Sequence, residues 1–189
     1  MTIFLFIFQW IVVIVLLAVL ILMFMWMANL MREGVPFIPV SKSILKQVEK
    51  VIGINDNSVV YDLGCGDGRV LFYLSKLHPK AKFIGIERST FPLFLSKVTA
   101  FFHNKKVENK VGIVKKDFFK TDLSNATHIF TYLRPDVMDN LLPKLDKELK
   151  TGTKLVSGYF QFTLKRPIAE ASFGKNSNDE RKRLFIYEF

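Results

Sequence analysis

A glycine-rich turn carries the clearest chemical signal in this sequence. Residues 61–69 read YDLGCGDGR, in which Gly64, Gly66 and Gly68 alternate with other residues. Glycine has no Cβ atom, so a backbone built from it can adopt positive φ angles and come close to a bound molecule. The turn stands where an apolar, β-branched run gives way to a segment of helical period. This placement predicts a ligand-binding loop between a strand and a helix.

The spacing of the glycines separates this loop from two common nucleotide-binding motifs. A dinucleotide fingerprint, G-x-G-x-x-G, needs a third glycine at position 69, where this chain has Arg69. A P-loop needs Gly-Lys followed by Ser or Thr, and that pair does not follow here. The pattern therefore favours a ligand without a pyrophosphate.

Acidic residues at later strand ends indicate what this ligand is. Glu87 ends the next predicted strand at the same edge of the sheet, where it could accept both hydroxyls of a ribose. Asp117 follows the third strand and could accept a hydrogen bond from an adenine amino group, with Phe118 packed on the ring. Carboxylates near the loop would attract a cationic ammonium and sulfonium. The set predicts S-adenosylmethionine bound by Asp62, Gly64, Cys65, Gly66, Asp67, Gly68, Glu87, Asp117 and Phe118.

Several of these residues also have a purely structural interpretation. Cys65 is the only cysteine and the three histidines are scattered, so we predict no disulfide and no metal site, and a small structural thiol is favoured over a nucleophile. Asp67 could instead cap the following helix. Glu87 and Asp117, taken singly, are ordinary strand-end acids. Their order after the glycine loop is what favours cofactor contact.

The elements that must position these residues follow from the hydrophobic periodicity. Beyond Gly53, short β-branched runs alternate with segments of helical period, which predicts a parallel, doubly wound α/β sheet with helices on both faces. Two final runs predict an antiparallel pair that closes the sheet. The predicted strands are residues 59–63, 82–87, 111–115, 127–132, 154–160, 168–173 and 183–189. The predicted helices are residues 69–77, 91–103 and 135–149, the last of them kinked or split at Pro143.

The N-terminus is apolar enough to cross a membrane. Residues 1–31 contain no charged side chain, and the run 3–28 exceeds the ~20 residues that span ~30 Å of hydrocarbon. A signal peptide is the alternative, but no Lys or Arg precedes the run and it lacks a small-x-small cleavage site. Basic residues follow the span, so the positive-inside rule predicts a single-pass protein with its domain on the cytoplasmic side.

The chain is thus predicted to have three parts: a transmembrane helix over 1–31, a connector and first helix over 32–53, and a catalytic domain over 54–189. The connector holds Pro36 and Pro39, which favour an extended backbone. Lys42, Lys46 and Lys50 share one face of the following helix. That face would either meet anionic lipid head groups or simply be solvated.

Asp62 to Gly68, Glu87 and Asp117, in this order and spacing, resemble the class I S-adenosylmethionine-dependent methyltransferases. The apolar anchor, the VPFIP segment at 35–39 and Gly-Ile-Glu at 85–87 narrow the resemblance to the membrane-anchored protein-lysine methyltransferases. That family includes mitochondrial enzymes acting on the ATP synthase c subunit and the adenine nucleotide translocase, with prokaryotic relatives. The resemblance implies a Rossmann-like, seven-stranded sheet and methyl transfer to a lysine ε-amine. Its specific motifs lie within about residues 35–136.

The acceptor side is less marked in the sequence. After the fourth predicted strand, where amine and nucleic-acid methyltransferases often carry Asn/Asp-Pro-Pro-aromatic, this chain has Thr-Tyr-Leu-Arg-Pro at 131–135. We predict that Tyr132 orients the amine and that Phe37 walls the channel, although a packed tyrosine is the plain alternative. Only nine residues separate Asp117 from the fourth strand. The crossover helix is therefore short or missing, which predicts an open site near the membrane.

Charge and anchor together set the expected partners. The net charge of +10 admits a nucleic acid, but we find no aromatic-basic recognition module, and no nucleic-acid partner is expected. We predict contact with membrane lipid through the N-terminal helix and a protein substrate, which could be a membrane protein. Two alternatives remain open: methylation of a lipid-borne small molecule such as a quinone or phospholipid head group, and a non-catalytic, cofactor-binding membrane factor.

Overall fold

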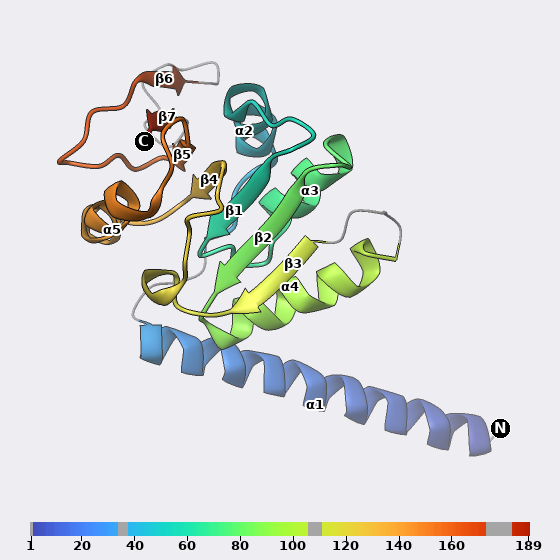
Figure 1. Cartoon of the computed structure of the whole chain (residues 1–189). Coiled ribbons are helices and arrows are strands. Elements are labelled where there is room, and N and C mark those ends of the chain that lie inside the picture. Colours follow the sequence, from blue (N-terminus) through green and yellow to red (C-terminus); the bar gives the residue numbers. More distant parts are fainter. Residues whose placement is uncertain (1, 34–37, 106–110, 173–182) are drawn as a thin grey trace.

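A seven-stranded mixed sheet forms the centre of the molecule (Figure 1). The computed structural model describes residues 2–33, 38–105, 111–172 and 183–189. The strand order is β3-β2-β1-β4-β5-β7-β6. The strands are β1 (Val59–Leu63), β2 (Lys82–Glu87), β3 (Val111–Lys115), β4 (His128–Thr131), β5 (Lys154–Gly158), β6 (Ala169–Ser172) and β7 (Arg183–Glu188).

The sheet is parallel from β3 to β5 and antiparallel beyond it. β1 pairs in parallel with both β2 and β4, and β3 and β5 extend the parallel part on either side. β7 runs antiparallel to β5, and β6 runs antiparallel to β7. This arrangement confirms the predicted Rossmann-like sheet with a closing antiparallel pair. The predicted strand ends at 127, 132, 159–160, 168 and 189 fall outside the observed strands.

Helices cover both faces of the sheet, as predicted. They are α2 (Lys42–Ile52), α3 (Arg69–Leu77), α4 (Thr90–His103) and α5 (Pro135–Glu148). α2 and α3 enclose one apolar cluster with one face of the sheet, and α5 encloses a second cluster with the other face. Each fully buried aliphatic side chain in these clusters contributes roughly 1.5–3 kcal/mol. The two clusters fix the sheet edge at which β1, β2 and β4 end.

Capping residues and proline account for the ends of helices α2 and α5. The Ser41 hydroxyl accepts a hydrogen bond from the amide of Ile44 at 3.4 Å, and Gly53 ends α2 with a φ of 73°. Pro135 occupies the first turn of α5, where no amide hydrogen is needed. Pro143 lies within α5, yet the helix continues through it to Glu148. Of the predicted kink or split at Pro143, the split is therefore wrong, and the kink stays a prediction.

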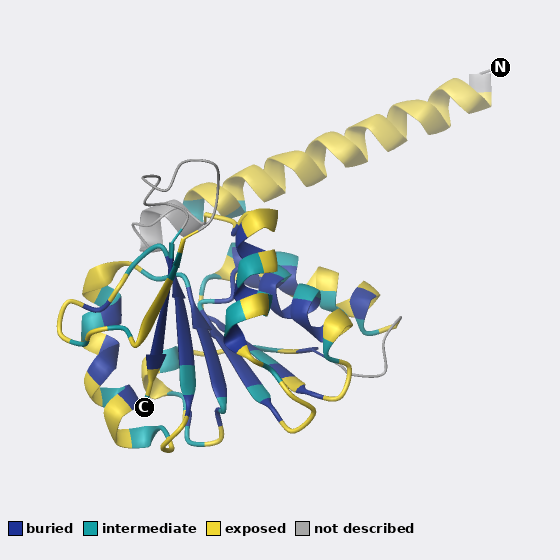
Figure 2. Cartoon of the chain, turned by 90° about the horizontal axis from the view of Figure 1, so that it is seen from above, coloured by how far each residue is buried: buried dark blue, intermediate teal, exposed yellow. Residues whose placement is uncertain are grey.

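The N-terminal helix α1 (Thr2–Glu33) extends away from the domain (Figure 2). Its segment Ile3–Ala28 is long and apolar enough to cross a membrane, and none of it is buried inside the molecule. α1 contacts α4, the helix that follows β2. The lysine stripe Lys42, Lys46 and Lys50 is exposed on α2, opposite the side chains that α2 buries.

Candidate active site

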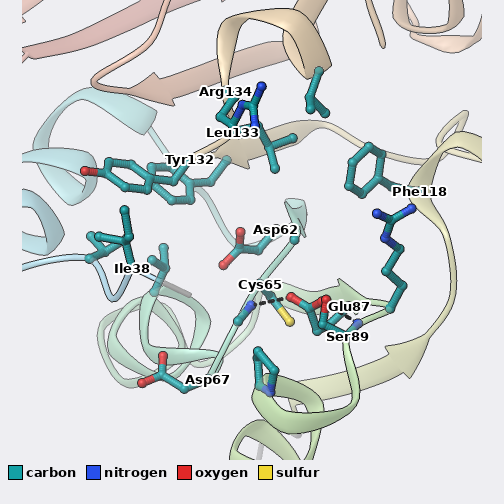
Figure 3. A pocket seen from close by; sticks show the side chains of 18 of the residues that line it. Ile38, Asp62, Cys65, Asp67, Glu87, Ser89, Phe118, Tyr132, Leu133 and Arg134 are labelled. Carbon is teal, nitrogen blue, oxygen red and sulfur yellow. Dashed lines mark hydrogen bonds between the residues drawn. The ribbon is translucent and has the colours of Figure 1, made fainter. Parts of the chain in front are cut away.

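A cleft of about 500 Å³ opens at the carboxyl edge of the parallel strands (Figure 3). The register places the strand ends together: Leu63 of β1 pairs with Ile86 of β2 and with Thr131 of β4. The residues that follow these three positions, Gly64, Glu87 and Tyr132, all line the cleft. The cleft lies where the strand order reverses, which is the place where open α/β sheets bind ligands.

The glycine loop leaves β1 in a conformation that side chains resist. Gly64, Gly66 and Gly68 have φ angles of 75°, 57° and 77°. The amides of Gly64 and Cys65 both donate to the carbonyl of Ile86, at 2.8 and 3.1 Å, which ties the loop to β2. Gly64 and Gly66 line the cleft, whereas Gly68 caps α3. A Cβ atom at Gly68 would lie 2.6 Å from the Phe72 ring, so this glycine lets α3 start close to the loop.

Asp62 places a buried carboxylate at the floor of the cleft. It is 2% exposed, and within the part of the chain that the structure describes no group donates a hydrogen bond to it. Burial raises its pKa well above the ordinary aspartate value, and the neighbouring carboxylates of Glu87 and Asp67 raise it further. A buried carboxylate without a donor is costly. Asp62 therefore marks the position where a cationic or donor group of a ligand would be stabilised.

Glu87 is held by backbone amides on both sides. Its Oε2 accepts from the amide of Gly66 at 3.0 Å, and its Oε1 accepts from the amide of Ser89 at 2.8 Å (Figure 3). Each carboxylate oxygen can accept more than one hydrogen bond. The buried carboxylate is thus fixed in direction, and both oxygens can still accept a hydroxyl from a ligand.

Asp67 and Arg69 join the loop to the segment that precedes α2. The Arg69 guanidinium donates from Nε to both carboxylate oxygens of Asp67 at 2.9 Å, and from Nη1 to the carbonyl of Val40 at 3.0 Å. The Asp67 carboxylate also accepts the amide of Arg69 at 3.2 Å, but Gly68 is the N-cap of α3, so the predicted alternative of Asp67 as the helix cap is wrong. Val40 and Ile38 line the cleft. The sequence did not point to Arg69, because its partner carbonyl is distant in the chain.

Of the two residues after β3 that were predicted to hold adenine, only one lines the cleft. Phe118 lines the cleft, but Asp117 is not among the residues that line it. The Asp117 carboxylate accepts from the amide of Phe119 at 2.9 Å and caps the 3₁₀ turn η1 (Phe118–Lys120). The structure describes every residue between β3 and β4, and η1 is the only helical element among them. The predicted short or missing crossover helix is confirmed.

An aromatic group lines the cleft on the side of Asp62 away from Phe118 (Figure 3). Tyr132 and Phe160 line it, with ring centroids 6.4 Å apart, and Tyr159 stacks on Tyr132 at 6.5 Å. A Cβ atom at Gly158 would lie 2.7 Å from the Tyr132 ring, so this glycine admits the ring. Tyr159 has a φ of 69°, which is strained for an aromatic residue. The sequence did not point to Tyr159 or Phe160, which were placed inside a strand.

Cys65 lines the cleft as a buried thiol. Burial raises its pKa, and the carboxylates of Asp62 and Glu87 raise it further, so the neutral thiol predominates. This state suits the structural role. Phe37 lies outside the described residues. Throughout the described residues, no three His, Cys, Asp or Glu side chains gather as a metal site would require.

The sequence matches the ANTKMT methyltransferase domain over residues 62–169, which is more than half of the chain. The chain belongs to this methyltransferase family. Its matched segment runs from Asp62 through the glycine loop and the aromatic group to β6, and so contains most of the cleft.

Relatives of this methyltransferase include lysine-modifying enzymes. A protein-lysine N-methyltransferase of Saccharolobus islandicus is 34% identical over 127 residues, which cover 67% of this chain and 78% of that protein. An adenine nucleotide translocase lysine N-methyltransferase of Mus musculus is 28% identical over 148 residues, covering 76% of this chain and 61% of the mouse protein. The chain therefore matches less than two thirds of the mouse enzyme.

A solved structure supports the same fold and cofactor for the methyltransferase. An RNA methyltransferase from Salinibacter ruber, solved with S-adenosyl-L-homocysteine, superposes with a TM-score of 0.71 and 26% identity. The match covers 80% of this chain and 93% of that chain. The cofactor of this methyltransferase is S-adenosylmethionine. The cleft fits it, because the buried carboxylate of Asp62 has no donor of its own and the glycine loop leaves space for close backbone approach.

Proposed function

We propose that this methyltransferase is tethered to a membrane by α1 and methylates a lysine ε-amine of a protein, which we expect to be a membrane protein. The observation that carries the proposal is that one cleft holds Asp62, Glu87 and the glycine loop together with Tyr132, which lies on the far side of Asp62 from Phe118 (Figure 3). We call the first part the acidic end and the part around Tyr132 the aromatic end. The first end suits the methyl donor and the second suits an amine acceptor. The lysine-modifying relatives support the choice of acceptor.

The acidic end would hold S-adenosylmethionine, which supplies an electrophilic methyl group on a sulfonium when bound. Asp62 would accept from the ammonium of the cofactor, and Glu87 would accept from its ribose hydroxyls. The backbone of the glycine loop, including Cys65 and Gly66, would contact the cofactor's amino-acid portion. Phe118 would pack on the adenine. Asp117 stays a prediction as the acceptor of the adenine amino group, since its carboxylate is shared with the Phe119 amide.

The aromatic end would prepare the acceptor. A lysine amine must lose its proton before it can attack, and a free lysine titrates near ~10.4. The rings of Phe130, Tyr132 and Phe160 line this part of the cleft, and removing the amine from water lowers its pKa. The Tyr132 hydroxyl would orient the amine by hydrogen bonding. We also propose Phe37 as a wall of the channel, because the nearby Ile38 lines the cleft.

The openness of the cleft favours a macromolecular acceptor. Only the short turn η1 lies between β3 and β4, so no helix among the described elements of this crossover covers the cleft. A small metabolite is usually enclosed to exclude water, whereas a lysine side chain brings its own protein surface to cover the opening. The mouth of this cleft therefore suits a lysine presented on a protein loop.

The length of chain between α1 and the cleft limits how far from the membrane the substrate lysine can lie. α1 ends at Glu33, and Ile38, five residues later, lines the cleft. Five residues of chain span at most about 18 Å. If Ile3–Ala28 crosses the membrane, the cleft lies close to its surface, on the cytoplasmic side according to the basic residues that follow the span. The substrate lysine would then lie near the membrane face.

Labelled cofactor distinguishes this function from its alternatives. Membranes incubated with the purified full chain and methyl-labelled S-adenosylmethionine are separated into protein, organic extract and RNA. We expect label in protein, at a lysine identified by mass mapping. Label confined to the organic extract would favour a quinone or phospholipid acceptor, and label confined to RNA would favour a nucleic-acid acceptor. Normal cofactor binding without label in any fraction would indicate a non-catalytic factor.

A further inference from the structure

The helix α4 exposes an apolar stripe that the domain leaves uncovered. Phe94, Val98, Phe101 and Phe102 are 45%, 42%, 58% and 60% exposed, with α1 in place. Their spacing of four, seven and eight residues from the first puts them on one helix face. The opposite face packs into the domain and carries the buried residues Pro92, Leu93, Ser96 and His103. Soluble surfaces rarely concentrate three phenylalanines in this way without a partner.

The position of α4 indicates which partner covers the stripe. α4 lies on the side of the sheet that faces α1, and the two helices are in contact (Figure 1). Within α1, Met25 and Ala28 are partly covered while the residues before them are exposed. The end of the apolar span is therefore the part of α1 that lies against the domain. A bilayer crossed by α1 would begin beside α4.

The charges around the stripe match a lipid surface. Lys97 is exposed at the edge of the stripe, and Lys105 follows the helix end with its Nζ 4.0 Å from the centroid of the Phe101 ring. Both side chains are long enough to keep their ammonium groups in the head-group layer while phenylalanine rings enter the boundary below. A helix with an apolar aromatic face edged by lysines is typical of segments that lie in the membrane interface.

We propose that the exposed face of α4 is a second membrane contact, which lies in the interface of an anionic bilayer beside the end of α1. The inference rests on the membrane tethering in the proposed function and adds an orientation to it. With both α1 and α4 at the bilayer, the domain cannot rotate freely about the connector. The open cleft would then keep a constant direction relative to the membrane face.

A site-specific probe tests this placement in the full chain. Val98→Cys is labelled with an environment-sensitive fluorophore, and the buried, neutral Cys65 is expected to stay unlabelled. The protein is reconstituted in vesicles that contain phosphatidylserine at a high lipid-to-protein ratio. Lys147→Cys, exposed on α5, is the matched control, and Leu16→Cys reports whether α1 is in the bilayer.

We expect spin-labelled lipid to quench the Val98 probe at least threefold more than the Lys147 probe, with the reverse order for aqueous iodide. Iodide quenching of both α4 and α5 probes, with the Leu16 probe in lipid, would overturn this inference and leave the tether intact. Iodide quenching of all three probes would overturn both. Protection of Val98 from lipid and iodide alike, lost on dilution with empty vesicles, would assign the stripe to a second copy and also overturn the inference.

Charge reversal supplies a second, independent measurement. Lys97→Glu with Lys105→Glu should reduce lipid quenching of the Val98 probe at least twofold in anionic vesicles and change it little in neutral ones. Both positions are exposed, so little effect on folding is expected. Lys147→Glu in α5 with Lys150→Glu just after it makes the same change of charge away from the stripe and serves as the control. An equal effect of the two pairs would overturn the proposed contact.

Discussion

Asp62 is the residue on which cofactor binding most depends. Its carboxylate is buried, lines the cleft and has no donor among the described residues, so an ammonium group would supply the interaction that the protein lacks. A hydrogen bond to a charged group contributes about 1.5–3 kcal/mol. The position was predicted from the sequence through its place before the glycine loop. The absence of a hydrogen-bond donor to its carboxylate could not be predicted from the sequence, because it depends on which side chains fold around Asp62.

Replacing Asp62 separates binding from folding. Asp62→Asn should weaken S-adenosylhomocysteine binding by roughly ten- to a hundredfold, since it removes the charge that faces the ammonium. Without ligand, the variant should melt at the same or a higher temperature, because the buried charge is gone. Calorimetry and thermal unfolding measure the two effects. Unchanged affinity, or a large loss of stability, would show that Asp62 is structural.

The raised pKa of Asp62 predicts a pH dependence of cofactor binding. The folded, ligand-free protein favours the protonated carboxyl, so below its raised pKa the ammonium meets a neutral group. Cofactor affinity should therefore fall as pH decreases through a range above the ordinary value of 3.8. In the same pH range, protonation removes the buried charge of Asp62, so the ligand-free protein should become more stable as the pH decreases. The dependence should be absent in Asp62→Asn, and its persistence there would assign it to another group.

The glycine loop and α3 show how much an element depends on one small residue. Alternating glycines before a helical segment predicted the loop and the start of α3 at Arg69, and both are observed. The contact between Gly68 and Phe72 was not predictable, since it depends on how closely the helix enters the loop. At the aromatic end, the φ of Tyr159 and the approach of Tyr132 to Gly158 likewise depend on tertiary packing. Periodicity placed the elements but not these contacts.

A pair of glycine substitutions measures that packing. Gly68 and Gly152 both have positive φ, 77° and 87°, but a Cβ atom at Gly152 meets nothing within 4 Å. Gly152→Ala should cost about 1 kcal/mol through backbone strain alone. Gly68→Ala should cost about 1–3 kcal/mol more, because the Phe72 ring must move. Denaturant unfolding compares the two variants, and equal losses would mean that Phe72 adapts freely.

The whole molecule combines a methyltransferase domain with the apolar helix α1, which we propose as an anchor that limits the reach of the cleft. The apolar N-terminus predicted α1 from composition alone, but its contact with α4 and the use of Ile38 and Val40 as cleft wall required the folded chain. Arg69 donates to the carbonyl of Val40, so Ile38 and Val40, the described cleft residues that precede α2, are part of the site. Under the proposed tethering, Val40 and Arg69 would link the cofactor cleft to the position of the membrane.

Lengthening the segment after Glu33 should let the cleft move farther from the membrane face. Twenty Gly/Ser residues inserted after Glu33 lower the effective concentration of the cleft at the membrane face. Methylation of the membrane target should slow several-fold, while transfer to a soluble lysine peptide stays unchanged. The same insertion before Thr2 is the control, because it leaves the path from α1 to the cleft intact. Equal rates for both insertions on the membrane target would argue against a fixed reach.

Methyl-lysine formed in membranes by the purified full chain, counted by mass spectrometry, is the decisive quantity. We expect methylation at a lysine near the cytoplasmic face of a membrane protein, dependent on S-adenosylmethionine and reduced at least tenfold by Asp62→Asn at a limiting cofactor concentration. Methyl groups recovered only in lipid or RNA, or methyl-lysine that forms equally well with Asp62→Asn, would show that the cleft does not perform the proposed transfer.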